Sequence, residues 1–275
     1  MSGNRIVESF AKANAANRAA LITFVMAGDP DQATTGALLE QLPGAGADLI
    51  EIGMPFSDPM ADGPAIQAAG IRALKGGANM HKTLALVTEF RAKNQTTPVI
   101  LMGYFNPILA FGELAFIAAA AHSGVDGLII VDLPPEEDAV FRTAAKAHGL
   151  TIIRLATPTT DEKRLPQVLD GAGGFLYYVS IAGITGTKSA TVDHVKAALA
   201  RFRHSTKLPL AVGFGVKTAA QITPLAQFAD GVVVGSAIVD RIAANLDGHG
   251  KPGAQIVPEI TALVRGLAQA TKRLA

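Results

Sequence analysis

The sequence predicts an α/β protein consisting of one closed (β/α)8 TIM barrel, with eight parallel strands inside a ring of helices. Eight short, near-continuous apolar runs alternate with alanine- and leucine-rich stretches long enough for crossover helices. The 275 residues match the usual length of such a barrel, and no polar linker divides them, so residues 1–275 are predicted to form a single domain. An open, doubly wound sheet is the main alternative.

Each predicted strand is followed by a turn rich in glycine or proline and then by a helical pattern. The eight strands are expected at Ala20–Met26, Asp48–Gly53, Pro98–Gly103, Gly127–Val131, Thr151–Ala156, Phe175–Val179, Leu208–Gly213 and Gly231–Gly235. Crossover helices are expected at Asp31–Leu42, Leu114–His122, Glu136–His148, Glu162–Leu169, Val192–Arg203 and Thr218–Phe228. An extra helix at Ile6–Asn14 is expected to cover the bottom of the barrel.

Composition excludes several classes of protein. Hydrophobic residues make up 49% of the chain and charged residues 17%, which excludes intrinsic disorder. The net charge of +1 argues against a nucleic-acid partner. The absence of cysteine excludes disulfides and thiolate chemistry, and the six histidines show no metal-ligand spacing. Without a secretory signal or an 18-residue apolar run, we expect a cytoplasmic protein with no membrane contact and a small-molecule ligand.

Two connections are longer than ordinary turns, and both follow the carboxyl ends of strands. The first runs from Met54 to Pro64, and the second from Ile181 to Ala190. Because barrel enzymes hold their active sites at this end, the two loops are interpreted as lids or binding loops.

Glu51 is the first candidate for catalysis. It alternates with Ile50 and Ile52, which suit the helix-facing side of the strand, so Glu51 is expected to point into the barrel. A buried carboxylate is costly unless it is paired or functional. Desolvation would raise its pKa and suit it to general acid–base work, while a structural ion pair is the alternative.

Asp62 lies in the first long loop, just before Gly63 and Pro64. Proline is common in the first turn of a helix, so Asp62 considered alone is more simply interpreted as a helix cap than as a functional group. Asp58, between Ser57 and Pro59, is interpreted as a turn residue.

Glycines gather after the last three predicted strands: Gly183 and Gly186, then Gly213-Phe214-Gly215, then Gly235-Ser236. Barrels often bind phosphate here through backbone N–H groups and a helix N-terminus, and Ser236 could both cap that helix and donate its hydroxyl. Isolated turn glycines are the alternative. The segment from Gly183 to Ser189 fails the spacing of a nucleotide-binding loop, so nucleotide hydrolysis is not predicted.

Aromatic and apolar side chains are expected at the same end of the barrel. Tyr177 alternates with Leu176, and Phe24, Met102, Tyr104 and Phe214 fall at the upper rim. Packing explains each one singly, whereas together they suit a flat aromatic ligand.

The chain resembles the α chain of tryptophan synthase from about Arg5 to Val264. The most specific match is the segment EIGMPFSDPMADGP at residues 51–64, and further matches lie at residues 102–107, 132–134, 183–186 and 213–215. The resemblance implies a barrel that cleaves indole-3-glycerol phosphate into indole and glyceraldehyde 3-phosphate.

The resemblance also implies residue roles. Glu51 and Asp62 would be the catalytic pair, with Glu51 moving protons and Asp62 accepting the hydrogen bond of the indole N–H. Tyr177 and Thr185 would position Glu51 and Asp62 respectively. Phosphate would be held by Gly186, Gly215, Gly235 and Ser236, and indole by Phe24, Met102, Tyr104 and Phe214.

No cofactor is implied in this chain, because the pyridoxal phosphate of the family belongs to its β partner. That partner, in an α2β2 assembly, would receive indole through a tunnel. By resemblance its contact surface would include Pro55, Phe56, Asn106, Pro107 and the turn at residues 133–135. Ile181 stands where some members of the family carry arginine, which bears on loop closure and on communication with the partner. A stand-alone lyase and a non-catalytic barrel that activates a partner remain alternatives.

Overall fold

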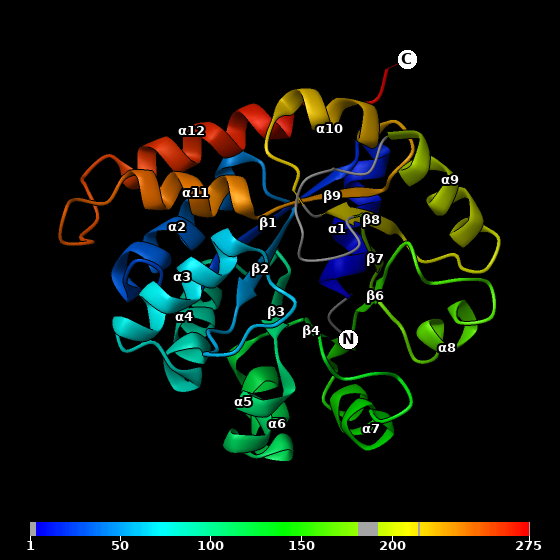
Figure 1. The fold of residues 1–275 in the computed structure, drawn as a ribbon, viewed down its shortest axis with the longest axis horizontal. Coiled ribbons are helices and arrows are strands. Elements are labelled where there is room, and N and C mark those ends of the chain that lie inside the picture. Colours follow the sequence, from blue (N-terminus) through cyan, green and yellow to red (C-terminus); the bar gives the residue numbers. More distant parts are fainter. Residues whose placement is uncertain (1–3, 181–191, 214, 275) are drawn as a thin grey trace.

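The computed structural model describes residues 4–180, 192–213 and 215–274 and shows parallel strands surrounded by a ring of helices (Figure 1). Neighbouring strands follow the order β5-β4-β3-β2-β1-β9-β8-β7-β6, and every pair is parallel. The strands are β1 Ala20–Met26, β2 Leu49–Gly53, β3 Val99–Gly103, β4 Gly127–Ile130, β5 Thr151–Ile152, β6 Arg154–Ala156, β7 Leu176–Val179, β8 Leu210–Gly213 and β9 Gly231–Val234.

The predicted fifth strand is divided into β5 and β6 by Ile153. β5 pairs with β4 and β6 pairs with β7, so this one stretch of chain joins the two ends of the sheet and closes the ring at a seam. The first strand pairs on both sides, with β2 and with β9. These pairings confirm the (β/α)8 barrel and exclude the open sheet.

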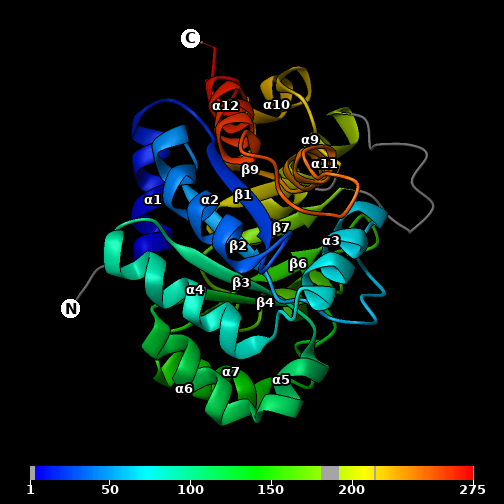
Figure 2. The same cartoon turned by 90° about the vertical axis from the view of Figure 1, so that its left-hand side faces the viewer.

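The helices cover the outside of the barrel, as the two perpendicular views show (Figures 1 and 2). They are α1 Arg5–Ala15, α2 Gln32–Ala45, α3 Pro64–Lys75, α4 Met80–Lys93, α5 Phe105–Phe111, α6 Glu113–Ser123, α7 Ala139–Ala147, α8 Leu165–Leu169, α9 Val192–Arg203, α10 Ala219–Ala226, α11 Ser236–Ala244 and α12 Ile256–Gln269. The predicted helices are all present, although α7 and α8 each begin three residues later than predicted.

Side chains of the strands divide between two cores because neighbouring residues of a strand face opposite sides. Ile50, Ile52 and Leu101 belong to the large cluster shared with the helices, whereas Leu49 and Ile100 belong to the cluster inside the barrel. Successive strands therefore contribute alternate residues to a packed interior.

Helix α1 covers the N-terminal end of the barrel, as predicted. Its Ile6 and Phe10 belong to the interior cluster. A Cβ atom on Gly127 or Gly174 would lie 3.2 or 3.3 Å from Ile6, and one on Gly231 would lie 3.1 Å from Phe10. The missing side chains of these three glycines thus make the room that α1 needs.

Aspartates immediately before β2, β4 and β9 fasten these strands to their neighbours. Each carboxylate accepts a backbone N–H at the start of the adjacent strand, and each also pairs with arginine. The three bonds join Asp48 to Leu21 at 2.8 Å, Asp126 to Val99 at 2.8 Å and Asp230 to Leu210 at 2.7 Å. These aspartate clamps fix the register at the N-terminal end of the barrel.

Within the described residues, no single helix is long and apolar enough to span a membrane. Helices α5 and α6 pass the test of length and composition only together, and the chain bends by 96° between them.

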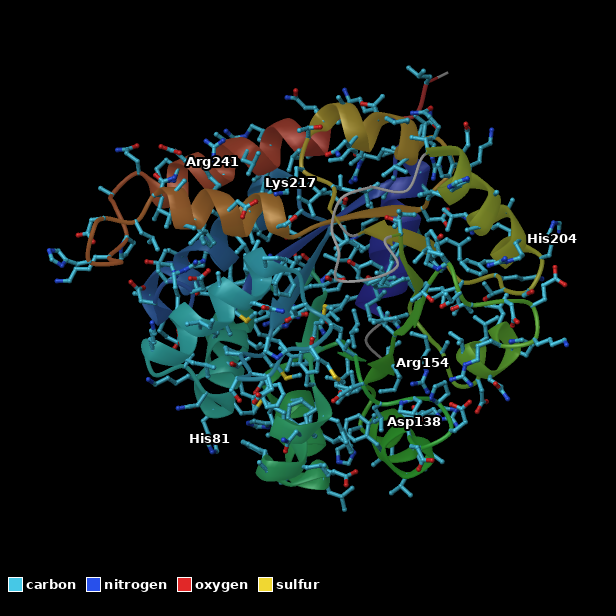
Figure 3. The ribbon with its side chains drawn as sticks, in the orientation of Figure 1. His81, Asp138, Arg154, His204, Lys217 and Arg241 are labelled. Carbon is cyan, nitrogen blue, oxygen red and sulfur yellow. The ribbon has the colours of Figure 1, made fainter. Side chains whose placement is uncertain are left out.

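A buried ion pair ties α7 to the seam. Arg154 of β6 donates a hydrogen bond to Asp138, which precedes α7, and both side chains are almost inaccessible to solvent (Figure 3). Arg142 lies 3.5 Å from the same carboxylate and also pairs with Asp170 at 2.6 Å.

We expect Arg154→Met to lower the free energy of unfolding by about 3 kcal/mol, because removing one partner leaves a buried charge poorly compensated. Urea denaturation at pH 7 measures the loss. Arg164→Met is the matched control, since the pair of Arg164 with Glu136 is exposed, and it should leave the midpoint unchanged. A loss for Arg154→Met below about 1 kcal/mol would show that Arg142 alone satisfies Asp138.

Candidate active site

Glu51 lies on β2 inside the barrel, as its alternation with isoleucines predicts. Its register neighbours are Phe24 on β1 and Ile100 on β3, and only 1% of its surface is exposed. Neither carboxylate oxygen has a hydrogen-bond partner in the part of the chain that the structure describes. The described residues therefore provide no structural ion pair for this carboxylate.

Burial controls the protonation of Glu51. Desolvation disfavours the charged form and raises the pKa from its ordinary value of 4.5 to about 8. The carboxyl group consequently carries its proton at neutral pH, and it loses that proton as the pH rises through about 8. A group with this pKa can both give and accept a proton near pH 7.

Asp62 lies in the loop between β2 and α3, which the structure holds in place with local hydrogen bonds. Its N–H donates to the carbonyl of Pro59 at 3.0 Å, and its carbonyl accepts from Gln67 at 2.9 Å. The N-cap of α3 is Gly63, and no side chain caps this helix. The cap interpretation of Asp62 is therefore wrong.

The Asp62 carboxyl group is partly desolvated. Burial raises its pKa to about 6, and a hydrogen bond from the Tyr104 hydroxyl opposes that rise. Between about pH 6 and pH 8 Asp62 is therefore ionised while Glu51 remains protonated. Glu51 on β2 and Asp62 on the loop that follows β2 thus have opposite protonation states at the same pH.

The expected apolar lining is present beside Glu51. Phe24 is buried on β1, and the half-buried Met102 on β3 packs against the cluster that contains Phe24. A Cβ atom on Gly53 would lie 2.5 Å from the Phe24 ring, and one on Gly235 would lie 3.2 Å from Phe24. Both glycines give the Phe24 side chain the space it occupies.

Tyr177 faces the interior from β7, where its ring lies in the same cluster as Phe175. Burial and the nearby charge of Glu51 raise the pKa of Tyr177 well above its ordinary value. A Cβ atom on Gly213 would lie 2.4 Å from the Tyr177 hydroxyl, so a side chain there would displace this tyrosine. Tyr177 is therefore near enough to Glu51 to feel its charge, although no hydrogen bond joins the two side chains.

The glycines predicted to bind phosphate lie where β8 and β9 end. Gly215 has φ +80, a left-handed backbone that favours glycine. Gly235 is the N-cap of α11, and Ser236 is the first helical residue, so the prediction that Ser236 caps this helix is wrong. The N–H groups in the first turn of α11 still lack intrahelical acceptors, as at every helix N-terminus.

Three expected site residues, Thr185, Gly186 and Phe214, lie outside the described residues, as do Gly183 and Ile181. Asn106 and Pro107, which the resemblance places at the contact surface for the partner, lie in the first turn of α5. The role of the Tyr104 hydroxyl was missed, because nothing in the sequence places the loop of Asp62 against the end of β3. Among the described residues, no group of three or more metal-ligating side chains is present.

A barrel that presents a desolvated carboxyl group near the carboxyl ends of its strands belongs to the class of (β/α)8 enzymes that work by proton transfer. Comparison with known proteins identifies the family within that class. The family model described as "Tryptophan synthase alpha chain" matches residues 10–272. The chain therefore belongs to the tryptophan synthase α chain family, and it is a lyase that cleaves indole-3-glycerol phosphate to indole and glyceraldehyde 3-phosphate.

Solved structures agree with this assignment. The tryptophan synthase α chain of Legionella pneumophila subsp. pneumophila is 38% identical with a TM-score of 0.87, and the match covers 98% of each chain. The α subunit from L. pneumophila strain Paris is also 38% identical, with a TM-score of 0.89 over 98% of this chain and 99% of that one. A tryptophan synthase chain of M. tuberculosis is 33% identical, with a TM-score of 0.86 over 98% of this chain and 100% of that one.

Proposed function

We propose that Glu51 is the acid–base group of the cleavage reaction and that Asp62 binds the indole N–H. The observation that carries the proposal is the state of the Glu51 carboxyl group, which is buried, unpartnered among the described residues and protonated at neutral pH. A protein keeps such a group at a cost to its stability, and proton transfer is the function that a pKa of about 8 serves.

The reaction requires that one proton is added to indole C3 and that one is removed from the glycerol hydroxyl. Protonated Glu51 donates to indole C3, and the ring becomes an indolenine cation. The ionised Glu51 then takes the proton from the glycerol hydroxyl next to the ring. As that oxygen forms the aldehyde C=O bond, the bond from its carbon to C3 breaks and its electron pair restores the indole ring. Glu51 ends protonated, ready for another turnover.

Asp62 stabilises the cationic stage of this reaction. Its pKa of about 6 makes it a carboxylate at neutral pH, able to accept a hydrogen bond from the indole N–H. That bond strengthens as positive charge develops on the ring, so it lowers the energy of the transition state more than that of bound substrate.

The remaining residues bind the two ends of the substrate. Phe24, Met102, Tyr104 and Phe214 line the indole site, and Tyr177 and Thr185 position Glu51 and Asp62. Gly186, Gly215, Gly235 and Ser236 bind the phosphate, for which the N-terminus of α11 supplies N–H groups and the favourable end of a helix dipole.

A β chain receives the indole, in an α2β2 assembly that holds pyridoxal phosphate in the β chain and works in the cytoplasm. Support comes from large apolar side chains exposed on neighbouring segments that follow β2, β3 and β4. They are Met60 at 69% exposure, Leu109 at 50% and Val140 at 76%. Large apolar side chains exposed on adjacent segments are typical of docking surfaces, and Phe56 and Pro134 lie in the same segments.

We expect the purified chain to release glyceraldehyde 3-phosphate slowly from indole-3-glycerol phosphate, and at least tenfold faster with saturating β chain. A coupled dehydrogenase assay follows the product while β chain is titrated, and light scattering gives the mass of the complex. The rate should saturate at one β chain per α chain.

The Glu51→Gln chain is the control, because it should form the same complex without cleaving. Equal, substantial rates with and without β chain would overturn the partner proposal and identify a stand-alone lyase. No cleavage in either condition would leave a barrel that only binds and activates its partner.

A further inference from the structure

Tyr104 connects the end of β3 to the loop that carries Asp62. The residue follows β3 directly and is only 3% exposed. Its hydroxyl oxygen accepts a hydrogen bond from the backbone N–H of Ala61 at 3.0 Å. Tyr104 therefore bonds the backbone immediately before Asp62, although the two residues are 42 positions apart in the sequence.

The proton of this hydroxyl goes to Asp62. A tyrosine hydroxyl has one donor proton, and here its oxygen already accepts from Ala61, so the proton is available to an acceptor. The Asp62 carboxyl group lies near enough to interact with this hydroxyl, which lowers the pKa of Asp62 and raises that of Tyr104, so it is the acceptor assigned to this proton. One hydroxyl group thus holds both the backbone and the side chain of the Asp62 segment.

The tyrosine is itself held firmly from both sides. Its ring lies 5.5 Å from that of Phe56, which belongs to the same loop as Asp62. The N–H of the next residue, Phe105, donates to Asp132 at 2.8 Å, which fixes the backbone after Tyr104. Because its ring and its backbone are both held, the Tyr104 hydroxyl donates in a defined direction. A water molecule in its place would not be held in this way.

We propose that Tyr104 is a positioning residue that directs one oxygen of the Asp62 carboxylate and leaves the other for the indole N–H. The inference rests on the proposed role of Asp62 and changes the role of Tyr104 from lining the indole site to orienting a charged group. A hydrogen bond donated to a carboxylate also favours its ionised form. Tyr104 therefore keeps Asp62 charged at a pH where its partial burial would otherwise protonate it.

Tyr104→Phe keeps the ring and removes the hydroxyl. We expect it to raise the pKa of Asp62 by about one unit, the effect of a hydrogen bond to a charged group. The direct measurement is a carboxyl ¹³C NMR titration of aspartate-labelled chain without substrate, in which Asp62→Asn identifies the resonance. Kinetically, the ratio of kcat/KM between Tyr104→Phe and wild type should be about 0.3 at pH 6.5 and rise to about 0.9 at pH 8.

Tyr178→Phe is the matched control. Tyr178 is equally buried but faces the helices, with its ring 5.6 Å from Phe202, and this variant should change neither the titration nor the pH profile. An Asp62 pKa unchanged in Tyr104→Phe would overturn the inference, as would a loss of activity that is the same at every pH. A shifted pKa with full activity in Asp62→Asn would instead overturn the proposed role of Asp62.

Discussion

Glu51→Gln should lower the rate of indole-3-glycerol phosphate cleavage by a factor of about 10² to 10⁴ or more, the contribution of a general acid–base group. Glutamine has nearly the same shape and can occupy the same site, but it cannot give and take a proton. Substrate binding should change little. A single-turnover assay separates the chemical step from binding, and a variant within tenfold of wild type would disprove the role.

The same variant should be more stable than wild type. Because the folded-state pKa of Glu51 lies above its ordinary value, the stability contributed by its bound proton is complete below pH 4.5 and is lost as the pH rises through about 8. Glutamine is neutral throughout, so the advantage of the variant should grow over this range and reach about 3 kcal/mol at pH 7. Urea denaturation at pH 5, 7 and 8.5 measures it.

Glu40→Gln is the control for this substitution. Glu40 is exposed and pairs with Lys93 on the outside of the molecule, so its variant should leave both activity and the pH dependence of stability unchanged. If Glu51→Gln destabilised the fold at pH 8.5, Glu51 would be a structural residue, and the proton-transfer role would lose its main support.

Asp62→Asn should cost about 1.5–3 kcal/mol of transition-state stabilisation, the strength of a hydrogen bond to a charged group, which lowers kcat roughly 10- to 150-fold. Asparagine can still accept a hydrogen bond from the indole N–H, but its oxygen carries no charge to oppose the cationic ring. The variant should keep its fold, since Asp62 is held in the loop by its backbone N–H and carbonyl, and the asparagine oxygen can still accept from the Tyr104 hydroxyl.

Measurement on the isolated chain, with pH varied from 5 to 9, tests this role. Wild type should gain activity as Asp62 ionises through pH 6 and lose it as Glu51 ionises through pH 8. Asp58→Asn is the matched control, an exposed carboxylate of the same loop, and should retain the wild-type rate. An unchanged kcat in Asp62→Asn would remove Asp62 from the mechanism.

The strands and helices with a clear periodic pattern of apolar residues were predicted correctly from the sequence. The apolar run of β1 and the periodic residues of α9 begin and end in the structure at the residues that the sequence predicts. The inward direction of Glu51 followed from its two isoleucine neighbours, whose helix-facing contacts the structure confirms. In these segments the period of the side chains alone determines the structure.

Other features depend on contacts between distant segments, which sequence patterns do not contain. Helix α5 is short and has no side-chain cap, and Pro107 in its first turn fits a rigid turn as well as a helix start. Helix α11 begins at Ser236 itself, so its N-cap is Gly235 and not Ser236. The pairing of Tyr104 with the Asp62 loop follows from the position of β3 beside β2 in the folded sheet.

Neighbouring strands of the barrel are not all held together equally well, and this difference determines where the barrel opens locally. The aspartate clamps secure β1 to β2, β3 to β4 and β8 to β9. Both β8–β9 and the β4–β5 contact at the seam have only two register pairs, but the seam has no such clamp among the described residues. Local opening begins where pairing is short and not reinforced, so amide hydrogens at the seam should exchange with solvent first. Glu51 lies on β2, between strands that stay closed during such an opening, so it remains shielded from water while the opposite side of the ring loosens.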